Sequence, residues 1–294
     1  MARPTTILKT IFSQRKATIL AGAANGLFAR IIEDLGYEAV YVTGAGVANM
    51  YLGAPDIGLT TLTEIAAHVA AIADAVALPL LVDADTGFGN PVNMVRTVKV
   101  LERAGAAGLQ IEDQVFPKKC GHTPGREVVP AEDMVRKIRV AREARASSDF
   151  LIIARTDART THGIDEALRR ADAYARAGAD VLFVESPESE AEMLRICHSF
   201  DLPCLANMVE GGRTPVLSFE ELRQIGYRLA IFPATGFLAA AQALTRVYSA
   251  LQARGSSKDA GLDLLPFAEM NKLMGFERVW AFDRQQAEGP PPTA

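Results

Sequence analysis

Residues 78–113 read LPLLVDADTGFGNPVNMVRTVKVLERAGAAGLQIED. The apolar run Leu78–Asp83 ends in an acidic residue, a stretch of helical period follows at Pro91–Ala104, and the apolar run Gly108–Glu112 ends in an acid again. The Ala-Gly-Ala sequence at 104–106 suits the turn between helix and strand, because glycine readily ends a helix. This segment therefore predicts one strand–helix–strand unit.

The same unit recurs along the whole chain. The predicted strands are Ala17–Ala23, Ala39–Thr43, Leu78–Asp83, Gly108–Glu112, Phe150–Arg155, Val181–Glu185, Cys204–Asn207 and Leu229–Pro233. The predicted helices include Leu62–Val76, Pro91–Ala104, Ala131–Ala146, Ile164–Ala177, Phe219–Ile225 and Phe237–Ala253. The strands are rich in Val, Ile and Leu without strict alternation, as in parallel sheets buried on both faces. The pattern predicts the α/β class and a (β/α)8 TIM-type barrel, with a doubly wound open sheet as the alternative.

The pattern changes near the C-terminus. We expect a barrel domain over residues 1–255 and a C-terminal linker and helical extension over residues 256–294. Residues 256–261 are polar, whereas Pro266–Gln286 has helical period and many apolar side chains. Such a segment is too apolar for a free tail, so we expect it to pack on the barrel or on a neighbouring subunit.

Composition excludes several classes of protein. The chain has 294 residues, of which 49% are hydrophobic and 22% charged, with a net charge of -4 and no tract of Lys and Arg. We therefore expect no nucleic-acid partner, and no membrane span because no apolar run approaches about 18 residues. The N-terminus lacks the apolar core of a signal peptide, and three cysteines are too few for a disulfide framework. A cytoplasmic location is expected.

Polar residues follow most of the predicted strands. In a barrel all of these positions meet at the C-terminal mouth, where barrel enzymes keep their active sites. The segments concerned are 41–46, 83–87, 112–114, 155–157, 185–186 and 207–212. Polar ends on so many apolar strands are hard to explain by solubility alone, so the sequence indicates an enzyme.

Three of these residues are candidate metal ligands. Asp83, Asp85 and Glu112 follow neighbouring strands, and Asp83 and Asp85 would point to the same side if the strand continued. Mg²⁺ prefers a few carboxylates together with waters and substrate oxygens. The alternative interpretation is that these acids cap helices or lie on the surface.

The segment Lys118-Lys-Cys-Gly-His122 is a second candidate site. Neighbouring cations favour the thiolate of Cys120 and can bind an anion, so the thiol is a candidate for proton transfer. Gly121 lets the backbone approach a ligand, and His122 is either a donor to that ligand or a residue that orders the loop. The alternative is that Cys120 is an incidental loop thiol; Cys197 and Cys204 are expected to be packing residues.

Two further features predict anion binding. Arg155 ends an apolar strand, and a buried arginine needs an anionic partner such as a substrate carboxylate. A salt bridge within the barrel, to Glu185 or Asp157, is the alternative. The turn Thr43-Gly-Ala-Gly46 offers backbone N–H groups, although it lacks the spacing of a phosphate-binding or dinucleotide fingerprint.

With these residues in place, the chain closely resembles the isocitrate lyase/phosphoenolpyruvate mutase superfamily from about Ala21 to Val247. The motifs that carry the resemblance are VDADTG at 82–87, IEDQ at 111–114, KKCGH at 118–122, ARTD at 154–157 and ANMVEGG at 206–212. The resemblance implies a barrel enzyme that uses Mg²⁺, with Mn²⁺ as a substitute, for 2-oxo acid chemistry. It also implies a homotetramer in which the last barrel helix is exchanged between subunits.

The resemblance implies roles for individual residues. Asp85 would contact the metal, and Asp56, Asp83 and Glu112 would hold its waters. The expected catalytic residues are Cys120, which would protonate a carbanion, Tyr41, which would stabilise an oxyanion, and His122, Arg155 and Glu185. The expected substrate-binding residues are Thr43, Gly44, Ala45, Gly121, Asn207 and Thr235.

The Cys120 loop resembles that of the lyase branch more than that of the mutase proper. The residues that follow, Thr123–Arg126, are closer to dimethylmalate lyases and oxaloacetate-cleaving relatives than to methylisocitrate lyases. We expect a Mg²⁺-dependent lyase that cleaves a 2-hydroxy di- or tricarboxylate into a 2-oxo acid and a carboxylic acid. The alternatives are an oxaloacetate hydrolase or decarboxylase and a carboxyphosphonoenolpyruvate-type phosphonomutase. A barrel retained only for binding would lack the carboxylates at the strand ends.

Overall fold

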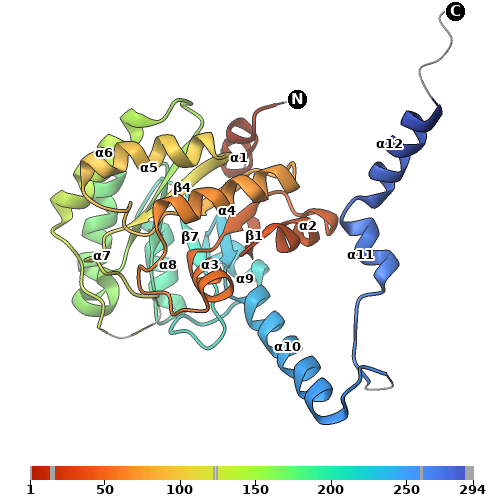
Figure 1. Cartoon of the computed structure of the whole chain (residues 1–294). Helices are drawn as coiled ribbons and strands as arrows, with labels where there is room; N and C mark the ends of the chain where they lie inside the picture. The colour runs from red at the N-terminus through yellow and green to blue at the C-terminus, as the bar shows by residue number, and fades with distance from the viewer. Residues whose placement is uncertain (1, 14–16, 122, 124, 259–260, 289–294) are drawn as a thin grey trace, which may run out of the picture. The chain divides into compact units, whose positions relative to one another are not determined.

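The computed structural model describes residues 2–13, 17–121, 123, 125–258 and 261–288. All eight predicted strands are present, and they form one parallel sheet in the order β6-β5-β4-β3-β2-β1-β8-β7. The strands are β1 (Thr18–Ala23), β2 (Val40–Val42), β3 (Leu80–Asp83), β4 (Ala106–Glu112), β5 (Leu151–Thr156), β6 (Val181–Val184), β7 (Leu205–Asn207) and β8 (Leu229–Phe232). A parallel bridge between Leu182 and Cys204 joins the two ends of this order. The fold is therefore the predicted (β/α)8 barrel (Figure 1).

The opening stretch of sequence folds as predicted. It forms β3, helix α5 (Pro91–Arg103) and β4. The helix starts there because Asn90 caps it, its side chain accepting from the backbone N–H groups of Val92 and Asn93, while Pro91 occupies the first turn. The chain leaves the helix through Gly105, whose φ of 104° disfavours any other residue.

The strand register brings the polar strand ends together. Asp83 pairs with Gln110 on the neighbouring strand, and Glu112 pairs with Arg155 on the next. Because paired residues in a parallel sheet lie at the same level, three successive strands place two acids and an arginine along one rim of the barrel.

The remaining helices follow or flank the strands. They are α1 (Pro4–Ser13), α2 (Gly26–Asp34), α3 (Gly44–Val47), the π-helix η1 (Ala48–Leu52), α4 (Leu62–Ala75), α6 (Ala131–Ala144), α7 (Ala158–Ala177), α8 (Glu190–His198), α9 (Phe219–Ile225), α10 (Thr235–Arg254), α11 (Phe267–Leu273) and α12 (Phe276–Glu288). None of the described helices combines the length and apolar character that crossing a bilayer requires.

The core has two layers. The larger one lies between the sheet and its surrounding helices, and the smaller one fills the barrel interior. The interior cluster contains Leu20, Leu81 and Phe183 from the strands and is joined by Leu8 and Phe12 of α1. Short α1 was not among the predicted helices, but it supplies apolar side chains to this interior cluster.

Two helix predictions need correction. Helix α7 begins at Ala158 rather than Ile164, with a non-helical residue, Gly163, inside it. The C-terminal stretch predicted as one helical segment forms two helices, α11 and α12. Gly275, with φ of 82°, separates them because an α-helix cannot continue through a left-handed residue.

The described chain comprises two compact units, Met1–Leu238 and Ala239–Ala294. The boundary falls inside α10, whereas the domain boundary expected from sequence, after residue 255, lies just beyond the end of that helix. All residues discussed for the pocket below belong to the first unit.

Candidate active site

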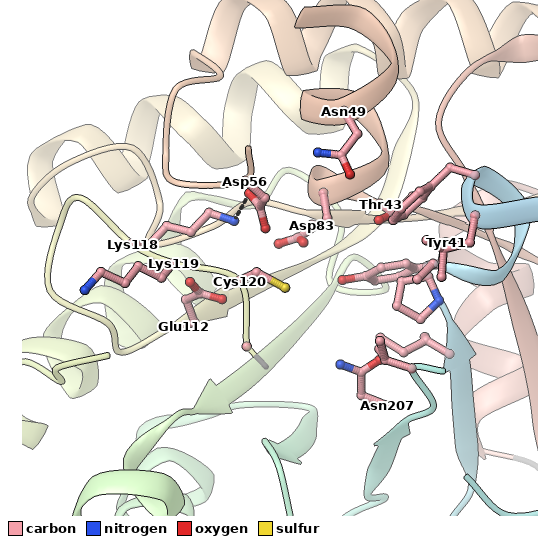
Figure 2. A pocket seen from close by; sticks show the side chains of 18 of the residues that line it. Tyr41, Thr43, Asn49, Asp56, Asp83, Glu112, Lys118, Lys119, Cys120 and Asn207 are labelled. Carbon is pink, nitrogen blue, oxygen red and sulfur yellow. Dashed lines mark hydrogen bonds and ion pairs between the residues drawn. The ribbon is translucent and has the colours of Figure 1, made fainter. Parts of the chain in front are cut away.

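A cavity of about 390 Å³ opens at the carboxyl ends of the strands. Figure 2 shows side chains from several strand ends and from the Cys120 loop pointing into it. The cavity is lined by most of the residues predicted from sequence, namely Tyr41, Thr43, Ala45, Asp56, Asp83, Glu112, Cys120, Gly121, Arg155 and Asn207. Barrel geometry thus collects residues that are up to 166 positions apart in sequence, as Tyr41 and Asn207 are.

The other predicted residues lie behind or beside this surface. Gly44, Asp85 and Glu185 are buried next to lining residues. The Thr235 hydroxyl donates a hydrogen bond of 2.6 Å to Glu210, which does line the cavity. His122 lies outside the described residues.

Acidic side chains surround the ammonium group of Lys118. Its Nζ lies 2.5 Å from Asp56 Oδ1 and 2.6 Å from Asp85 Oδ1, and the lysine is almost fully buried. Burial lowers the pKa of Lys118, but Asp85, Glu112 and Asp56 outweigh this effect and hold its pKa well above the usual value. Lys118, whose charge the sequence suggested for anion binding, therefore forms ion pairs with carboxylates of the protein itself.

Asp85 has a special backbone conformation. Its φ is 47°, so it lies outside β3, and the expectation that Asp83 and Asp85 share one side through strand alternation is wrong. Both carboxylates nevertheless face Gly44: a Cβ placed there would lie 3.0 Å from Asp83 Oδ2 and 3.4 Å from Asp85 Oδ1. A left-handed aspartate is uncommon and marks a position that the surrounding structure constrains.

The carboxyl groups outnumber the neighbouring lysine, and burial makes their charged forms unfavourable. Burial raises the pKa of Asp85 to about 7; Lys118 opposes this rise, and Asp83 and Asp56 add to it. Burial likewise raises the pKa of Glu112 well above its usual value, against the opposing effect of Arg155. A group of like charges held out of water is the environment in which a bound cation is most favourable.

The donor set fits a hard cation. Glu112 Oε1 is buried and has no hydrogen-bond partner among the described residues. No three described His, Cys, Asp or Glu side chains converge on one point. Mg²⁺ does not require such convergence, because it keeps several waters and binds through one or two carboxylates. Asp85 with Asp56, Asp83 and Glu112 around it satisfies that requirement.

Arg155 is held by acids of the barrel. Its guanidinium lies 2.9 Å from Asp157 through both Nε and Nη2, 3.2 Å from Glu185 Oε2 and 3.4 Å from Glu112 Oε2. The salt bridges that the sequence offered as an alternative therefore exist, and Arg155 lines the cavity all the same. Such multiple pairing fixes the orientation of the guanidinium at the cavity wall.

Tyr41 is connected to Asp83 through Gln110. Its hydroxyl donates to Gln110 Oε1 at 2.7 Å, and Gln110 Nε2 donates to Asp83 Oδ1 at 3.3 Å. Burial, reinforced by Asp83, raises the pKa of Tyr41 well above its usual value, so the phenol stays protonated. The role expected for Tyr41 at an oxyanion requires its proton to turn from Gln110 to the ligand.

The Cys120 loop enters the cavity at close range. A Cβ added to Gly121 would lie 3.0 Å from Glu185 and closer still to Arg155, so the glycine is required by this approach. The loop is held by Ser186, whose hydroxyl donates to the Gly121 carbonyl at 3.0 Å, and by the Cys120 N–H, which donates to the Asp56 carbonyl at 3.1 Å. The sulfur of Cys120 points into the cavity (Figure 2).

Several lining residues were not predicted. They are Asn49, Pro55, Val209, Glu210, Ile231, Pro233, Ala234, Phe237 and Leu238. Most are apolar, and apolar side chains after a strand resemble ordinary core residues in sequence. Gln110, which lies behind the cavity surface, could have been predicted from sequence. It lies two residues before Glu112 on the same strand, so its side chain faces the same side.

Comparisons with known proteins agree with this geometry. The family model described as phosphoenolpyruvate phosphomutase matches residues 8–252. The chain is 47% identical to 2,3-dimethylmalate lyase of Eubacterium barkeri, over 96% of this chain and 98% of that protein. It is 41% identical to 2-methylisocitrate lyase of Aeropyrum pernix, over 98% of this chain and 92% of that protein.

Solved structures give the same result. A structure of 2,3-dimethylmalate lyase superposes with a TM-score of 0.91 at 34% identity, covering 97% of this chain and 96% of that one. Oxaloacetate acetylhydrolase in complex with 3,3-difluorooxalacetate also gives 0.91, at 30% identity, covering 99% of this chain and 100% of that one.

Fold, pocket and comparisons together define a barrel enzyme, and the chain belongs to the phosphoenolpyruvate phosphomutase family within the isocitrate lyase/phosphoenolpyruvate mutase superfamily. Within that superfamily it is a carbon–carbon bond lyase, in agreement with the two lyases named above, which it matches over nearly its full length.

Proposed function

We propose that this lyase cleaves a 2,3-dialkylmalate and that cleavage requires Mg²⁺. The observation that carries the proposal is the division of the cavity into two kinds of wall. The charged wall contains Asp83, Glu112 and Arg155, from the ends of β3, β4 and β5. The apolar wall contains Ile231, Pro233, Ala234, Phe237 and Leu238, from β8 and the residues that follow it, which β1 and β2 separate from β3 in the strand order. A malate with alkyl substituents offers carboxylates to the first wall and hydrocarbon to the second.

The apolar wall is also the reason to prefer a dicarboxylate to a tricarboxylate. A third carboxylate placed against Phe237 and Leu238 would meet apolar side chains that offer it no hydrogen bond, which is less favourable than hydration by water. An alkyl group at the same place gains from burial. The 47% identity to a protein named 2,3-dimethylmalate lyase supports the same substrate class.

In this proposal Asp85 holds the metal, and Asp56, Asp83 and Glu112 hold its waters. When bound, Mg²⁺ supplies positive charge that offsets negative charge on the oxygens of the 2-oxo acid half. A metal held by Asp85 would compete with Lys118 for this carboxylate, because Lys118 Nζ lies 2.6 Å from Asp85 Oδ1.

The chain's own residues orient the substrate and move a proton. Arg155 and the backbone at Thr43–Ala45 bind the 2-oxo acid half. The 2-hydroxyl loses its proton, the C2–C3 bond breaks, and its electron pair remains on C3 of the leaving carboxylic acid. The thiol of Cys120 donates its proton to C3, and the proton lost from the hydroxyl restores the thiol.

The test is a substrate screen with the purified protein and Mg²⁺. 2,3-Dimethylmalate, unsubstituted malate, 2-methylisocitrate and oxaloacetate are compared by the release of 2-oxo acid or oxalate. We expect 2,3-dimethylmalate to give pyruvate and propionate with the highest kcat/KM. Preference for 2-methylisocitrate would contradict the role given to the apolar wall.

A second candidate is hydrolytic cleavage of oxaloacetate. The similarity to oxaloacetate acetylhydrolase, with a TM-score of 0.91, favours it. In the same screen this activity appears as oxalate and acetate in equal amounts from oxaloacetate.

A further inference from the structure

Cys120 lies in a loop with two limbs. At the base of the loop, Gln114 pairs with Val128 in an antiparallel bridge. The first limb is fastened near its tip by Lys118, which reaches Asp56 and Asp85. The second limb returns to the base through Arg126.

Arg126 fastens the second limb to the barrel. Its Nη1 donates to Asp157 Oδ1 at 2.7 Å, and Nη2 donates to the hydroxyl of Thr160. Both Arg126 and Asp157 are almost completely shielded from solvent, with side-chain exposures of 1% and 0%. A charged hydrogen bond in such surroundings is strong and has a defined geometry.

The same carboxylate also holds Arg155. Asp157 Oδ1 accepts from Arg126 Nη1 and from Arg155 Nη2, and Asp157 Oδ2 accepts from Arg155 Nε. One aspartate thus connects the loop that carries the thiol with the arginine on the cavity wall.

Asp157 is itself rigidly mounted. Its backbone N–H donates to Asp113 Oδ1 at 2.8 Å, and Asp113 is fully buried. Asp113 also accepts from Thr156 and Tyr174, both at 2.7 Å. The anchor to which Arg126 is tied is therefore part of the barrel and not of another loop.

From this arrangement we propose that Arg126 is a positioning residue. Because Asp157 accepts hydrogen bonds from both Arg126 and Arg155, Arg126 fixes the position of the Cys120 loop relative to the Arg155 guanidinium. It touches no part of the cavity surface, so its effect passes through the loop. The kinetic part of this inference rests on the proposed function, whereas its effect on the accessibility of the thiol does not.

The test uses the full chain with Arg126 replaced by Met, which keeps length and removes the donors. We expect the rate at which iodoacetamide alkylates Cys120, measured by mass spectrometry, to rise about tenfold, with Cys197 in the same digest as internal reference. With a substrate that wild-type protein cleaves, kcat should fall about 10²-fold while KM changes by less than about threefold, because misplacement affects the reacting geometry more than binding. Asp157 keeps its two bonds to Arg155, so no buried charge is left unpaired.

Arg159→Met is the matched control. Arg159 is an arginine near the start of α7 whose side chain is 15% exposed, and it pairs with Glu188 and Glu192 and not with the loop. We expect it to leave the Cys120 alkylation rate and kcat within about twofold of wild type. Arg126→Lys, which can still donate to Asp157, should restore most of both readouts.

Wild-type alkylation and kcat in a folded Arg126→Met protein would overturn the proposal, as would an equal effect of Arg159→Met. If Arg126→Met does not fold, Thr160→Val, which removes one of the two groups that hold the Arg126 guanidinium, decides: faster alkylation of Cys120 than wild type supports the proposal, and an unchanged rate overturns it. If the wild-type protein cleaves none of the proposed substrates, the proposed function fails while the alkylation comparison still stands.

Discussion

At the scale of single residues, the pocket depends on a thiol and a group of carboxylates that the backbone holds close together. Asp85 takes a left-handed conformation at φ of 47°, and Gly121 approaches Arg155 and Glu185 too closely for any side chain. These are positions where the chain accepts conformational cost or forgoes a side chain. The first two predictions concern this scale.

Cys120→Ser should lower kcat by about 10²- to 10⁴-fold while substrate binding survives. The volume changes little, but a hydroxyl is far less acidic than a thiol and is a poor proton donor to carbon. Steady-state kinetics on the best substrate of the screen measure the effect. Cys197→Ser, in α8 and remote from the cavity lining, is the control and should keep near-normal kcat. A Cys120→Ser enzyme with normal kcat on every lyase substrate would favour the phosphonomutase reading instead.

Removal of divalent metal should abolish turnover. We expect EDTA to stop cleavage and Mg²⁺ or Mn²⁺ to restore it, because both are hard cations that accept carboxylate and water ligands. Asp85→Asn should raise the Mg²⁺ concentration required for half-maximal rate, since it replaces a charged ligand with a neutral one. Full activity in excess chelator would contradict the assignment of Asp85 as a metal ligand.

At the scale of elements, the barrel rim is stabilised by one buried acceptor. Asp113 follows β4. It receives hydrogen bonds from Thr156, the last residue of β5, from Asp157 directly after it, and from Arg170 and Tyr174 on α7. Burial raises the pKa of Asp113, with Asp157 adding to the rise and its hydrogen-bond donors opposing it. Both carboxylate oxygens of Asp113 accept hydrogen bonds, and these bonds hold the end of β5 and helix α7 at the same residue.

Asp113→Asn should destabilise the protein by about 2 kcal/mol, because one acceptor oxygen becomes an NH₂ group facing donors. For a chain of this size we expect Tm to fall by about 4–8 °C. Thermal unfolding followed by circular dichroism measures the shift. Asp172→Asn removes an exposed ion pair with Arg176 on the same helix and should change Tm by less than about 2 °C. Equal shifts in the two variants would show that the buried position is not special.

At the scale of the whole molecule, the C-terminal unit exposes an unusual amount of apolar surface. Phe267 is 80% exposed, Phe282 60% and Val279 51%, and no described residue of α10 is buried. Exposed apolar helices of this kind are typical of a surface that packs on another part of the protein or on another chain. The superfamily resemblance favours the second case, a homo-oligomer with exchanged C-terminal helices, which stays a prediction.

We therefore predict a tetramer, with a mass in light scattering of about four times the 31.6 kDa chain. The double variant Trp280→Asp with Phe282→Asp should yield smaller species, because charges cannot be buried in an apolar interface. Val92→Asp, at a site 78% exposed on α5, is the control and should leave the mass unchanged. A wild-type monomer at micromolar concentration would refute the prediction.

Sequence by itself determined the barrel and many of the residues that line the pocket. Apolar strands and amphipathic helices alternate in a local pattern, and the strand ends that carry Asp83, Glu112, Arg155 and Asn207 can be read without knowing any long-range contact. Residues at those ends converge for a topological reason, since parallel strands in a closed sheet all end at one rim. The motif at 118–122 was equally visible.

Tertiary structure alone decided which charges meet. The local sequence around Lys118 does not indicate that it pairs with Asp56 and Asp85. Nor does the local sequence indicate that Arg126 and Arg155 both pair with Asp157. The apolar wall at Phe237 and Leu238 was equally hidden, because in sequence it resembles the start of an ordinary helix. Pairing and pocket shape depend on distances between segments remote in sequence, and only the packed barrel sets those distances.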